Sequence, residues 1–302
     1  MNTTEDFASG VESFPNQPSS LEPIVEEAAP VVSFHANNPP WGLPQGLLTW
    51  FLSLLILAGV ELIITIGYIA YQRSHGLNPT SESLLHDPKF LFFNVLGYFP
   101  IHLLTLLLAW VVVTQMGRFD FWRMIGWRRP TLLEVCLSIG LAVLLFGIAV
   151  VLTAVFGGQE TDIDRIVQSS RPTAFALAIL AVATAPLVEE IIYRGVLYPA
   201  SQRAIGRTGA IVLVAGLFAV GHVYQYWPNF GVISAIVLLS VALTMVRAFS
   251  GRLLPCFIIH FVFNGIQSIG IVVASYFRPP GSGAEHKAAA FLTLLHSFQH
   301  LL

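Results

Sequence analysis

Seven long apolar segments decide what this chain can fold into. Each approaches the roughly 20 apolar residues that a helix needs to cross the hydrocarbon core of a bilayer. Only 11% of the 302 residues are charged, against roughly 25% in soluble domains. We therefore predict an all-α, polytopic transmembrane helical bundle of about seven membrane helices. The segments cover residues 47–71, 90–114, 131–156, 173–199, 209–227, 230–247 and 253–277.

The regions around these segments divide the chain into four parts. Residues 1–44 contain no Lys or Arg and are rich in Pro, Ser, Asn and Glu, which predicts a disordered acidic tail. At its end, Trp41 and the nearby Trp50 are expected to act as anchors at the membrane interface. Two membrane helices follow in 45–125, and residues 126–278 form the core of the bundle. Residues 279–302 place apolar side chains on one helical face but are too short and polar to span, which predicts an interfacial helix.

Basic residues in the loops predict the orientation of the bundle. One side receives eight arginines, Arg118, Arg123, Arg128, Arg129, Arg203, Arg207, Arg247 and Arg252. The opposite side receives six basic residues, Arg73, Lys89, Arg165, Arg171, Arg278 and Lys287. The positive-inside rule therefore predicts a cytoplasmic amino terminus. A net charge of -2 gives no indication of nucleic-acid binding, which requires clustered basic residues on a soluble face.

The stretch Leu187–Pro199, LVEEIIYRGVLYP, contains three charged residues in an otherwise apolar run. Each charge at such a depth costs at least about 2.5 kcal/mol, so the stretch calls for an explanation. Side chains four residues apart share a helical face, which pairs Glu190 with Arg194 and places Glu189 beside Tyr193. The opposite charges of Glu190 and Arg194 compensate each other. Glu189 is left without an opposite charge in its own helix, which suits a general base or acid.

Two further helices contribute polar side chains at the same depth. Phe218 and His222 are four residues apart on one, and His260 and Asn264 are four apart on another. Counted along their helices, these residues and Glu189 lie about 10 to 20 Å from the same membrane surface. We therefore expect one cavity to collect Glu189, His222, His260 and Asn264.

Two chemistries fit such a set of side chains. A carboxylate and an imidazole can polarise a water molecule, while a second histidine and an amide donate hydrogen bonds to the oxyanion of a tetrahedral intermediate. Alternatively, Glu189, His222 and His260 could hold Zn²⁺, with water in the fourth position. Both support hydrolysis of a peptide bond, and the residues alone leave the choice open.

Other polar signals in the sequence are weaker. Glu61 and His102 are lone polar residues in the first two membrane segments, and we expect them to face the bundle and form hydrogen bonds. The hydrolase motifs HExxH and GxSxG do not occur, and neither do the phosphate-binding motifs GxGxxG and GxxxxGK[ST]. Chemistry driven by ATP is therefore not indicated.

Three motifs, Glu189-Glu190-x-x-x-Arg194, Phe218-x-x-x-His222 and His260-x-x-x-Asn264, follow one another on successive membrane helices. In this order they resemble the CPBP intramembrane protease family, which includes type II CAAX prenyl endopeptidases and bacterial Abi-like and bacteriocin-processing proteins. The resemblance covers residues 130–275. It implies an intramembrane endopeptidase of the glutamate or metallo type, in the bilayer of a prokaryotic plasma membrane, with its site open to the cytoplasmic side.

The resemblance also implies roles for the residues. Glu189 would activate water with His222 as its partner, while His260 and Asn264 would surround the oxyanion or a metal ion. The substrate would be a peptide or protein, lipid-modified in the case of a CaaX tail. A non-catalytic immunity or scaffold protein, or a proton-coupled carrier, is the alternative. Carriers commonly contain paired repeats, of which the sequence shows none.

Overall fold

The fold is helical throughout the part of the chain that the structure describes. The computed structural model describes residues 34–157 and 159–277, and within these ranges it contains no β-strand. The predicted interfacial helix at 279–302 and the predicted tail up to residue 33 lie outside the described residues. The elements, of which η1 and η2 are π-helical, are α1 (Leu43–Ser74), α2 (Ser81–Leu85), α3 (Pro88–Thr114), α4 (Phe121–Met124), α5 (Leu132–Phe156), α6 (Asp162–Ser169), α7 (Arg171–Ile179), η1 (Leu180–Thr184), α8 (Ala185–Glu190), η2 (Ile191–Leu197), α9 (Tyr198–Tyr226), α10 (Phe230–Ser250) and α11 (Leu254–Phe277).

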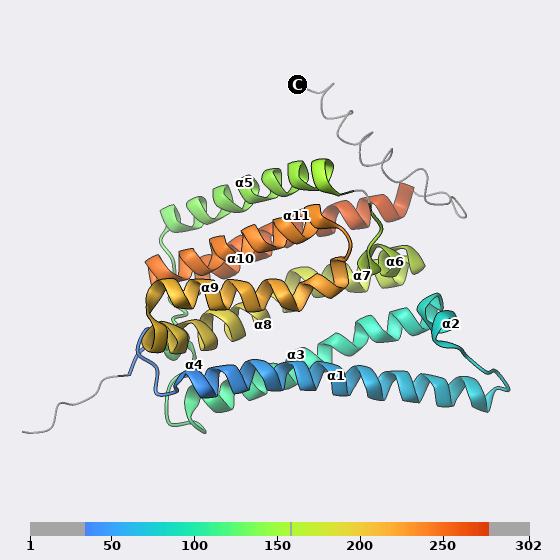
Figure 1. The fold of residues 1–302 in the computed structure, drawn as a ribbon, viewed down its shortest axis with the longest axis horizontal. Coiled ribbons are helices and arrows are strands. Elements are labelled where there is room, and N and C mark those ends of the chain that lie inside the picture. Colours follow the sequence, from blue (N-terminus) through green and yellow to red (C-terminus); the bar gives the residue numbers. More distant parts are fainter. Residues whose placement is uncertain (1–33, 158, 278–302) are drawn as a thin grey trace, which may run out of the picture. The chain divides into compact units, whose positions relative to one another are not determined.

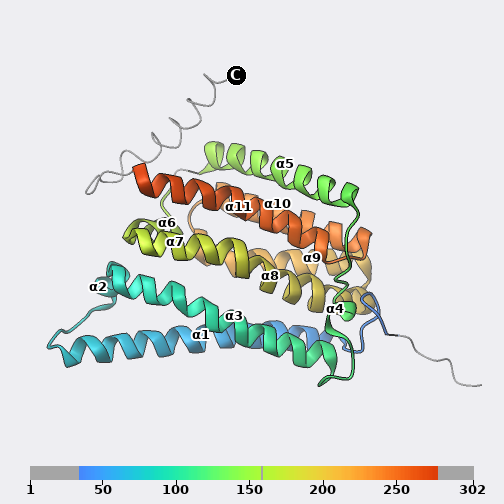
Figure 2. The same ribbon diagram turned by 180° about the vertical axis from the view of Figure 1, so that it is seen from behind.

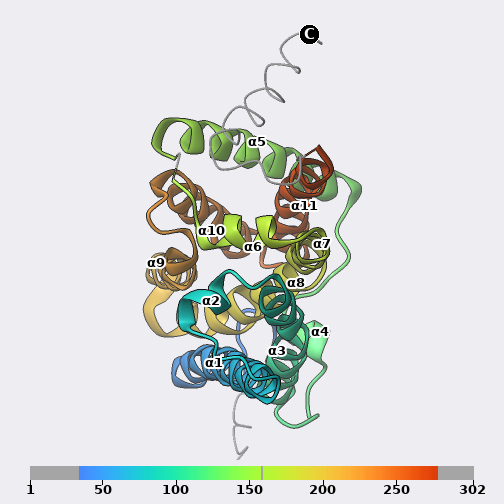
Figure 3. The same cartoon turned by 90° about the vertical axis from the view of Figure 1, so that its right-hand side faces the viewer.

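Long apolar helices confirm the predicted transmembrane bundle. Among the described residues, six helical runs are long and apolar enough to cross a membrane. Five of them are the helices α1, α3, α5, α10 and α11, and the sixth is the continuous run Arg171–Tyr226. In all three views α1 lies beside α3, and α5 lies against α10 and α11 (Figures 1, 2 and 3). The run from α7 to α9 lies between these two groups.

The run Arg171–Tyr226 folds back on itself at Gly206. The backbone there has a φ of 75°, a left-handed value that glycine adopts without the steric penalty of a Cβ atom. The rings of Tyr193 and Phe218 lie 5.0 Å apart, whereas 25 residues of straight helix would separate them by about 37 Å. The fourth and fifth predicted segments are therefore both present, joined by a sharp turn at one glycine.

Asp87 connects the end of α1 to the start of α3. It precedes Pro88, whose missing N–H is not needed at the first position of a helix. One carboxylate oxygen accepts a hydrogen bond from Lys89 N at 2.9 Å, and the other accepts one from the Tyr68 hydroxyl at 2.6 Å. The α1–α3 pair is thus joined at the end opposite to the charged stretch.

Residues 34–42 belong to the folded core, although their composition predicts a disordered tail as far as residue 44. Trp41 is 1% exposed, and its indole N–H donates to the carbonyl of Val196 in η2 at 2.9 Å. Arg203 donates to the carbonyls of Pro39, at 2.6 Å, and of Trp41, at 3.0 Å. The prediction of Trp41 as an interfacial anchor is therefore wrong, because its indole N–H finds an acceptor inside the bundle.

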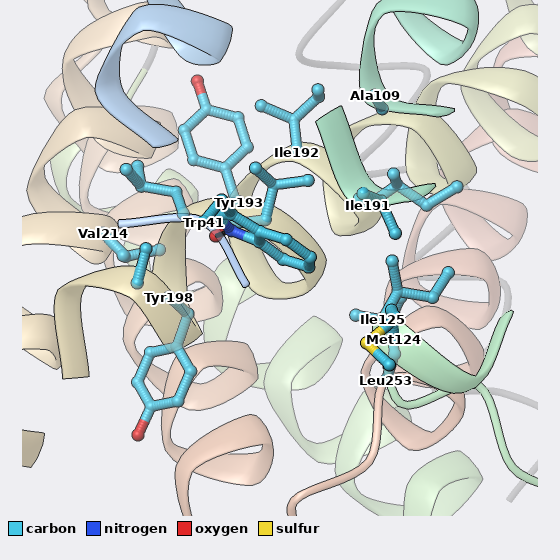
Figure 4. Packing of buried hydrophobic residues seen from close by; sticks show 14 of the residues in the cluster. Trp41, Ala109, Met124, Ile125, Ile191, Ile192, Tyr193, Tyr198, Val214 and Leu253 are labelled. Atoms are coloured by element: carbon cyan, nitrogen blue, oxygen red, sulfur yellow. Dashed lines mark hydrogen bonds between the residues drawn. The ribbon is translucent and has the colours of Figure 1, made fainter. Parts of the chain in front are cut away.

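The main apolar cluster surrounds η2. Trp41 and Tyr193 lie together in it, and Met124, Ile125 and Leu253 form a second group beside the same helix (Figure 4). The cluster draws on the segment before α1, on α3, α4 and α9, and on the loop before α11. Segments far apart in the sequence therefore exclude water from the part of the bundle that carries Arg194.

The lone polar residues of the first two membrane segments form hydrogen bonds, as predicted. The amide of Asn94 on α3 donates to the carboxylate of Glu61 on α1. The Nδ1 atom of His102 lies 2.9 Å from the hydroxyl oxygen of Thr184, in the last position of η1. Both contacts link helices that pack side by side.

Arg247 does not lie in a loop, contrary to the prediction from the limits of the apolar segments. It is fully buried in the last turns of α10, which extends to Ser250. Its Nε donates to the carbonyl of Arg194 at 3.0 Å, and its other nitrogens donate to Asn37 and Ala36. Without Arg247, the predicted cytoplasmic side has seven loop arginines, against six basic residues on the opposite side. The orientation of the bundle in the membrane therefore stays a prediction.

Gly231 provides a test of how closely α10 and α5 pack. A Cβ atom there would lie 2.6 Å from Leu152 O and 2.7 Å from Thr153 Cα, both backbone atoms that cannot rotate away. We expect Gly231→Ala to lower the free energy of unfolding by about 1–3 kcal/mol, measured as a lower melting temperature in detergent. Gly216→Ala, with no neighbour within 4 Å, is the control and should melt with the wild type. Equal melting of both variants would contradict this packing.

Candidate active site

Glu189 and Glu190 end up in different environments because consecutive residues of a helix point about 100° apart. Both lie at the end of α8, just before η2. The Glu190 side chain is completely buried, whereas the Glu189 side chain keeps 25% of its exposure. One carboxylate is therefore committed to the interior, and the other faces a space that water can reach.

Glu190 forms the ion pair that helical spacing predicts. Its Oε1 atom accepts a hydrogen bond from Arg194 Nη1 at 3.1 Å, with both side chains fully buried. The remaining donors of Arg194 bind Ser240 and Thr244 of α10, at 2.9 Å to Ser240 Oγ and 3.3 Å to Thr244 Oγ1. The guanidinium also lies 4.6 Å from the centre of the Phe218 ring, a favourable cation–π distance. These contacts offset the desolvation of the arginine.

Glu190 also binds His260, a contact that the sequence did not indicate. Its Oε1 atom lies 2.9 Å from His260 Nδ1, and the imidazole is 3% exposed. An ionised carboxylate only accepts hydrogen bonds, so Nδ1 of His260 carries the proton. The other ring nitrogen, Nε2, is then directed toward Glu189, 3.7 Å from its Oε2 atom.

His222 is oriented by its own helix. Its Nδ1 atom lies 2.8 Å from the carbonyl oxygen of Phe218, which again only accepts, so Nδ1 is the donor. The imidazole stacks on the Phe218 ring with 4.5 Å between centres. Its Nε2 atom lies 4.0 Å from Glu189 Oε1. Phe218 therefore contacts Arg194 and both histidines of the site.

Glu189 thus faces the Nε2 atoms of two histidines at distances too long for direct hydrogen bonds, which rarely exceed about 3.2 Å. In neutral imidazoles protonated on Nδ1, both Nε2 atoms are acceptors, as is the carboxylate. The carboxylate and the two Nε2 atoms repel one another unless a proton donor or a cation lies between them. A water molecule that donates to Glu189 or to a histidine meets this need, as would a metal ion.

The donor set of Glu189, His222 and His260 has the chemistry of a zinc site, but its spacing is wider. Zn–N and Zn–O bonds of about 2.0–2.1 Å place tetrahedral ligands about 3.4 Å apart. The observed separations from Glu189 are 3.7 and 4.0 Å. Within residues 34–157 and 159–277, no group of three or more His, Cys, Asp or Glu residues has the geometry of a metal site.

Asn264 binds the backbone of η1 rather than Glu189. Its amide Nδ2 donates to the carbonyl of Ala181 at 2.9 Å. In a π-helix this carbonyl would pair with the N–H five residues later, but that residue is Pro186, which has none. The asparagine therefore satisfies a carbonyl that the proline leaves without a backbone donor. Its second amide hydrogen is not used in this contact.

Several residues that support the site were not predicted from the sequence. Ser240 and Thr244 are four residues apart in an apolar helix, a spacing that could have indicated a shared polar partner. Trp50, expected at the interface, is partly buried and donates its indole N–H to the Tyr193 hydroxyl at 3.1 Å. Tyr193 thereby ties α1 to η2. No pattern in the sequence pointed to this contact.

Isosteric substitution of the two glutamates separates their structural roles. Glu190→Gln leaves Arg194 buried without a counter-charge, which should lower the free energy of unfolding by about 3 kcal/mol. Glu189→Gln changes a partly exposed side chain that forms no ion pair with a Lys or Arg among the described residues. We expect only the first to lower the melting temperature clearly. A larger loss of stability in Glu189→Gln would contradict the assignment.

One comparison with known proteins finds a family model that is similar to part of the chain. Residues 171–266 match the family model described as type II CAAX prenyl endopeptidase Rce1-like. No curated protein and no solved structure matched the chain. The matched segment contains all three motifs and extends from α7 into α11. Together with the membrane helices it supports a multi-pass membrane protein of the protease class. The segment 171–266 is therefore similar to the Rce1-like family of type II CAAX prenyl endopeptidases, in agreement with the resemblance that the three motifs carry.

Proposed function

We propose that the protein is an intramembrane endopeptidase in which Glu189 and His222 activate a water molecule. The observation that carries this proposal is the arrangement of Glu189 between the Nε2 atoms of His222 and His260, 4.0 and 3.7 Å away. A water molecule in this space would lie within reach of all three groups. Peptide-bond hydrolysis is also the chemistry that the family match implies.

In this proposal Glu189 is the general base. It accepts a proton from the water molecule as the oxygen attacks the carbonyl carbon of the scissile bond. The proton then passes to the leaving amine, either from Glu189 or through His222 Nε2. Because Phe218 O holds Nδ1–H of His222, the ring keeps its Nε2 atom directed to Glu189 throughout.

His260 and Asn264 are the proposed donors to the oxyanion. When Nε2 of His260 is also protonated, the imidazolium faces the carboxylate of Glu190 and can donate to the negative oxygen. The second amide hydrogen of Asn264 is a further donor. In this arrangement Glu190 orients His260, as a buried acid orients a histidine in other hydrolases.

Zn²⁺ remains the alternative centre, with Glu189, His222 and His260 as its ligands. A bound ion would make its water molecule more acidic and polarise the peptide carbonyl. We propose the metal-free centre because the separations from Glu189 exceed those of tetrahedral zinc ligands. The proposed substrate is a peptide or protein segment at the membrane, whether or not it carries a lipid.

Glu189→Gln is the main test of the proposed function. The amide cannot accept the proton of water, so we expect cleavage to fall by at least about 100-fold while the melting temperature stays near that of the wild type. The activity is measured by peptide mass spectrometry on proteoliposomes that contain wild-type or variant protein and a membrane peptide library. Glu82→Gln, at an exposed side chain of the short helix α2, is the control and should leave cleavage intact. Undiminished cleavage by Glu189→Gln would overturn the proposal and favour a binding or scaffold role.

Metal removal tests the choice between the two centres. We expect the purified protein to contain far less than one zinc ion per chain and to keep its activity after dialysis against 1,10-phenanthroline. Elemental analysis by mass spectrometry provides the metal content of each sample. Activity that disappears on chelation and returns with one equivalent of Zn²⁺ would establish the zinc centre instead.

A further inference from the structure

His102 is a third histidine near the catalytic carboxylate, and it comes from a helix outside the family-matched segment. It lies on α3, which packs against α7, η1 and α8 (Figures 2 and 3). Its Nδ1 atom lies 2.9 Å from Thr184 Oγ1, and its ring meets the Tyr98 ring edge-on at 6.1 Å. Thr184 lies five residues before Glu189 in the same helical run. The catalytic proposal leaves His102 without a role.

The partner of His102 occupies a special position in the backbone. Thr184 is the last residue of η1, and the next residue, Ala185, donates its N–H to Leu180 O five residues earlier. A turn with this i→i+5 bond holds about one more residue than an α-helical turn. Each added residue changes the direction of all later side chains by about 100°. The π-turn therefore determines the side of the bundle toward which Glu189 points.

Side chains on two neighbouring helices hold η1. Asn264 of α11 binds the carbonyl of Ala181, which Pro186 leaves without a donor. His102 of α3 binds the hydroxyl of Thr184 from another helix. The hydroxyl's own contact within η1, to Leu180 O, is long at 3.4 Å. The histidine is therefore the closer polar partner of Thr184.

We propose that His102 is a positioning residue of the active site, which keeps η1 in its π-helical form through Thr184 and so directs Glu189 toward His222 and His260. This proposal rests on the proposed function, because it assigns His102 to the same hydrolytic centre. It places part of the catalytic machinery on α3, outside residues 171–266. His102 does not contact the reacting atoms and acts through the backbone of η1.

The first part of the test compares substitutions of His102. His102→Phe keeps the ring but loses the hydrogen bond, and we expect kcat to fall about 10- to 100-fold with KM changed less than about twofold. His102→Asn places an amide near the position of Nδ1 and should recover most of kcat. Melting temperatures of both variants in detergent should stay within a few degrees of the wild type.

The second part removes the partner. Thr184→Val has the shape of threonine without its hydroxyl, so it should reduce kcat as His102→Phe does and fold normally. If the two residues act as one pair, the double variant will be no slower than the slower single variant. Wild-type kcat in Thr184→Val, additive losses in the double variant or failure of His102→Asn to recover activity would each overturn the proposal.

Glu189→Gln in the same assay separates this proposal from the proposed function. If Glu189→Gln abolishes cleavage and both His102→Phe and Thr184→Val cleave at the wild-type kcat, only the positioning role fails. If Glu189→Gln cleaves normally, the hydrolytic assignment fails first. Should His102→Phe not fold, the comparison of Thr184→Val with wild type decides the outcome alone.

Discussion

The buried ion pair between Glu190 and Arg194 is the interaction on which the site depends. Two charges at membrane depth are tolerated where they compensate each other, because removal of either charge leaves the other buried without a counter-charge. Arg194 donates hydrogen bonds to Ser240 and Thr244 of α10 and lies over the Phe218 ring of α9, while Glu190 binds His260 on α11. The pair therefore joins three helices around one point. The carboxylate of Glu189, one residue away, is positioned by this arrangement.

Much of this centre could be predicted from helical spacing alone. The pairing of Glu190 with Arg194, and the stacking of Phe218 on His222, follow from intervals of four residues, which survive modest changes of helical pitch. Counting residues from the membrane surface was also enough to bring Glu189, His222 and His260 together. Depth depends on the rise along a helix, and this is nearly the same for every residue. The match of residues 171–266 to the Rce1-like family model agrees with both.

The details that could not be predicted concern direction rather than depth. A π-turn uses the same apolar residues as an α-helix, so neither η1 nor η2 leaves a periodic signal, although each changes the direction of the side chains after it. Asn264 is an example, since its amide goes to a backbone carbonyl that only the combination of π-turn and Pro186 leaves free. Arg247 and Trp41 were misplaced for a related reason. Composition and segment limits predict where a residue of a given type lies on average. The position of a single buried side chain depends instead on where its hydrogen-bond acceptor lies, as for Arg247 and Trp41.

The position of Trp41 has a consequence for what counts as a unit of this protein. Its indole N–H binds a carbonyl of η2, and the segment around it is held by Arg203 and Arg247, both within residues 171–266. The core of the matched segment is therefore completed by the side chain of Trp41, which lies outside this segment. A shortened chain that begins at residue 171 would therefore keep every motif, expose an apolar gap, and leave the carbonyl of Val196 and several donors of Arg203 and Arg247 without these partners. The family model covers residues 171–266, but the folding unit extends beyond them, to a segment that lies 130 residues before residue 171.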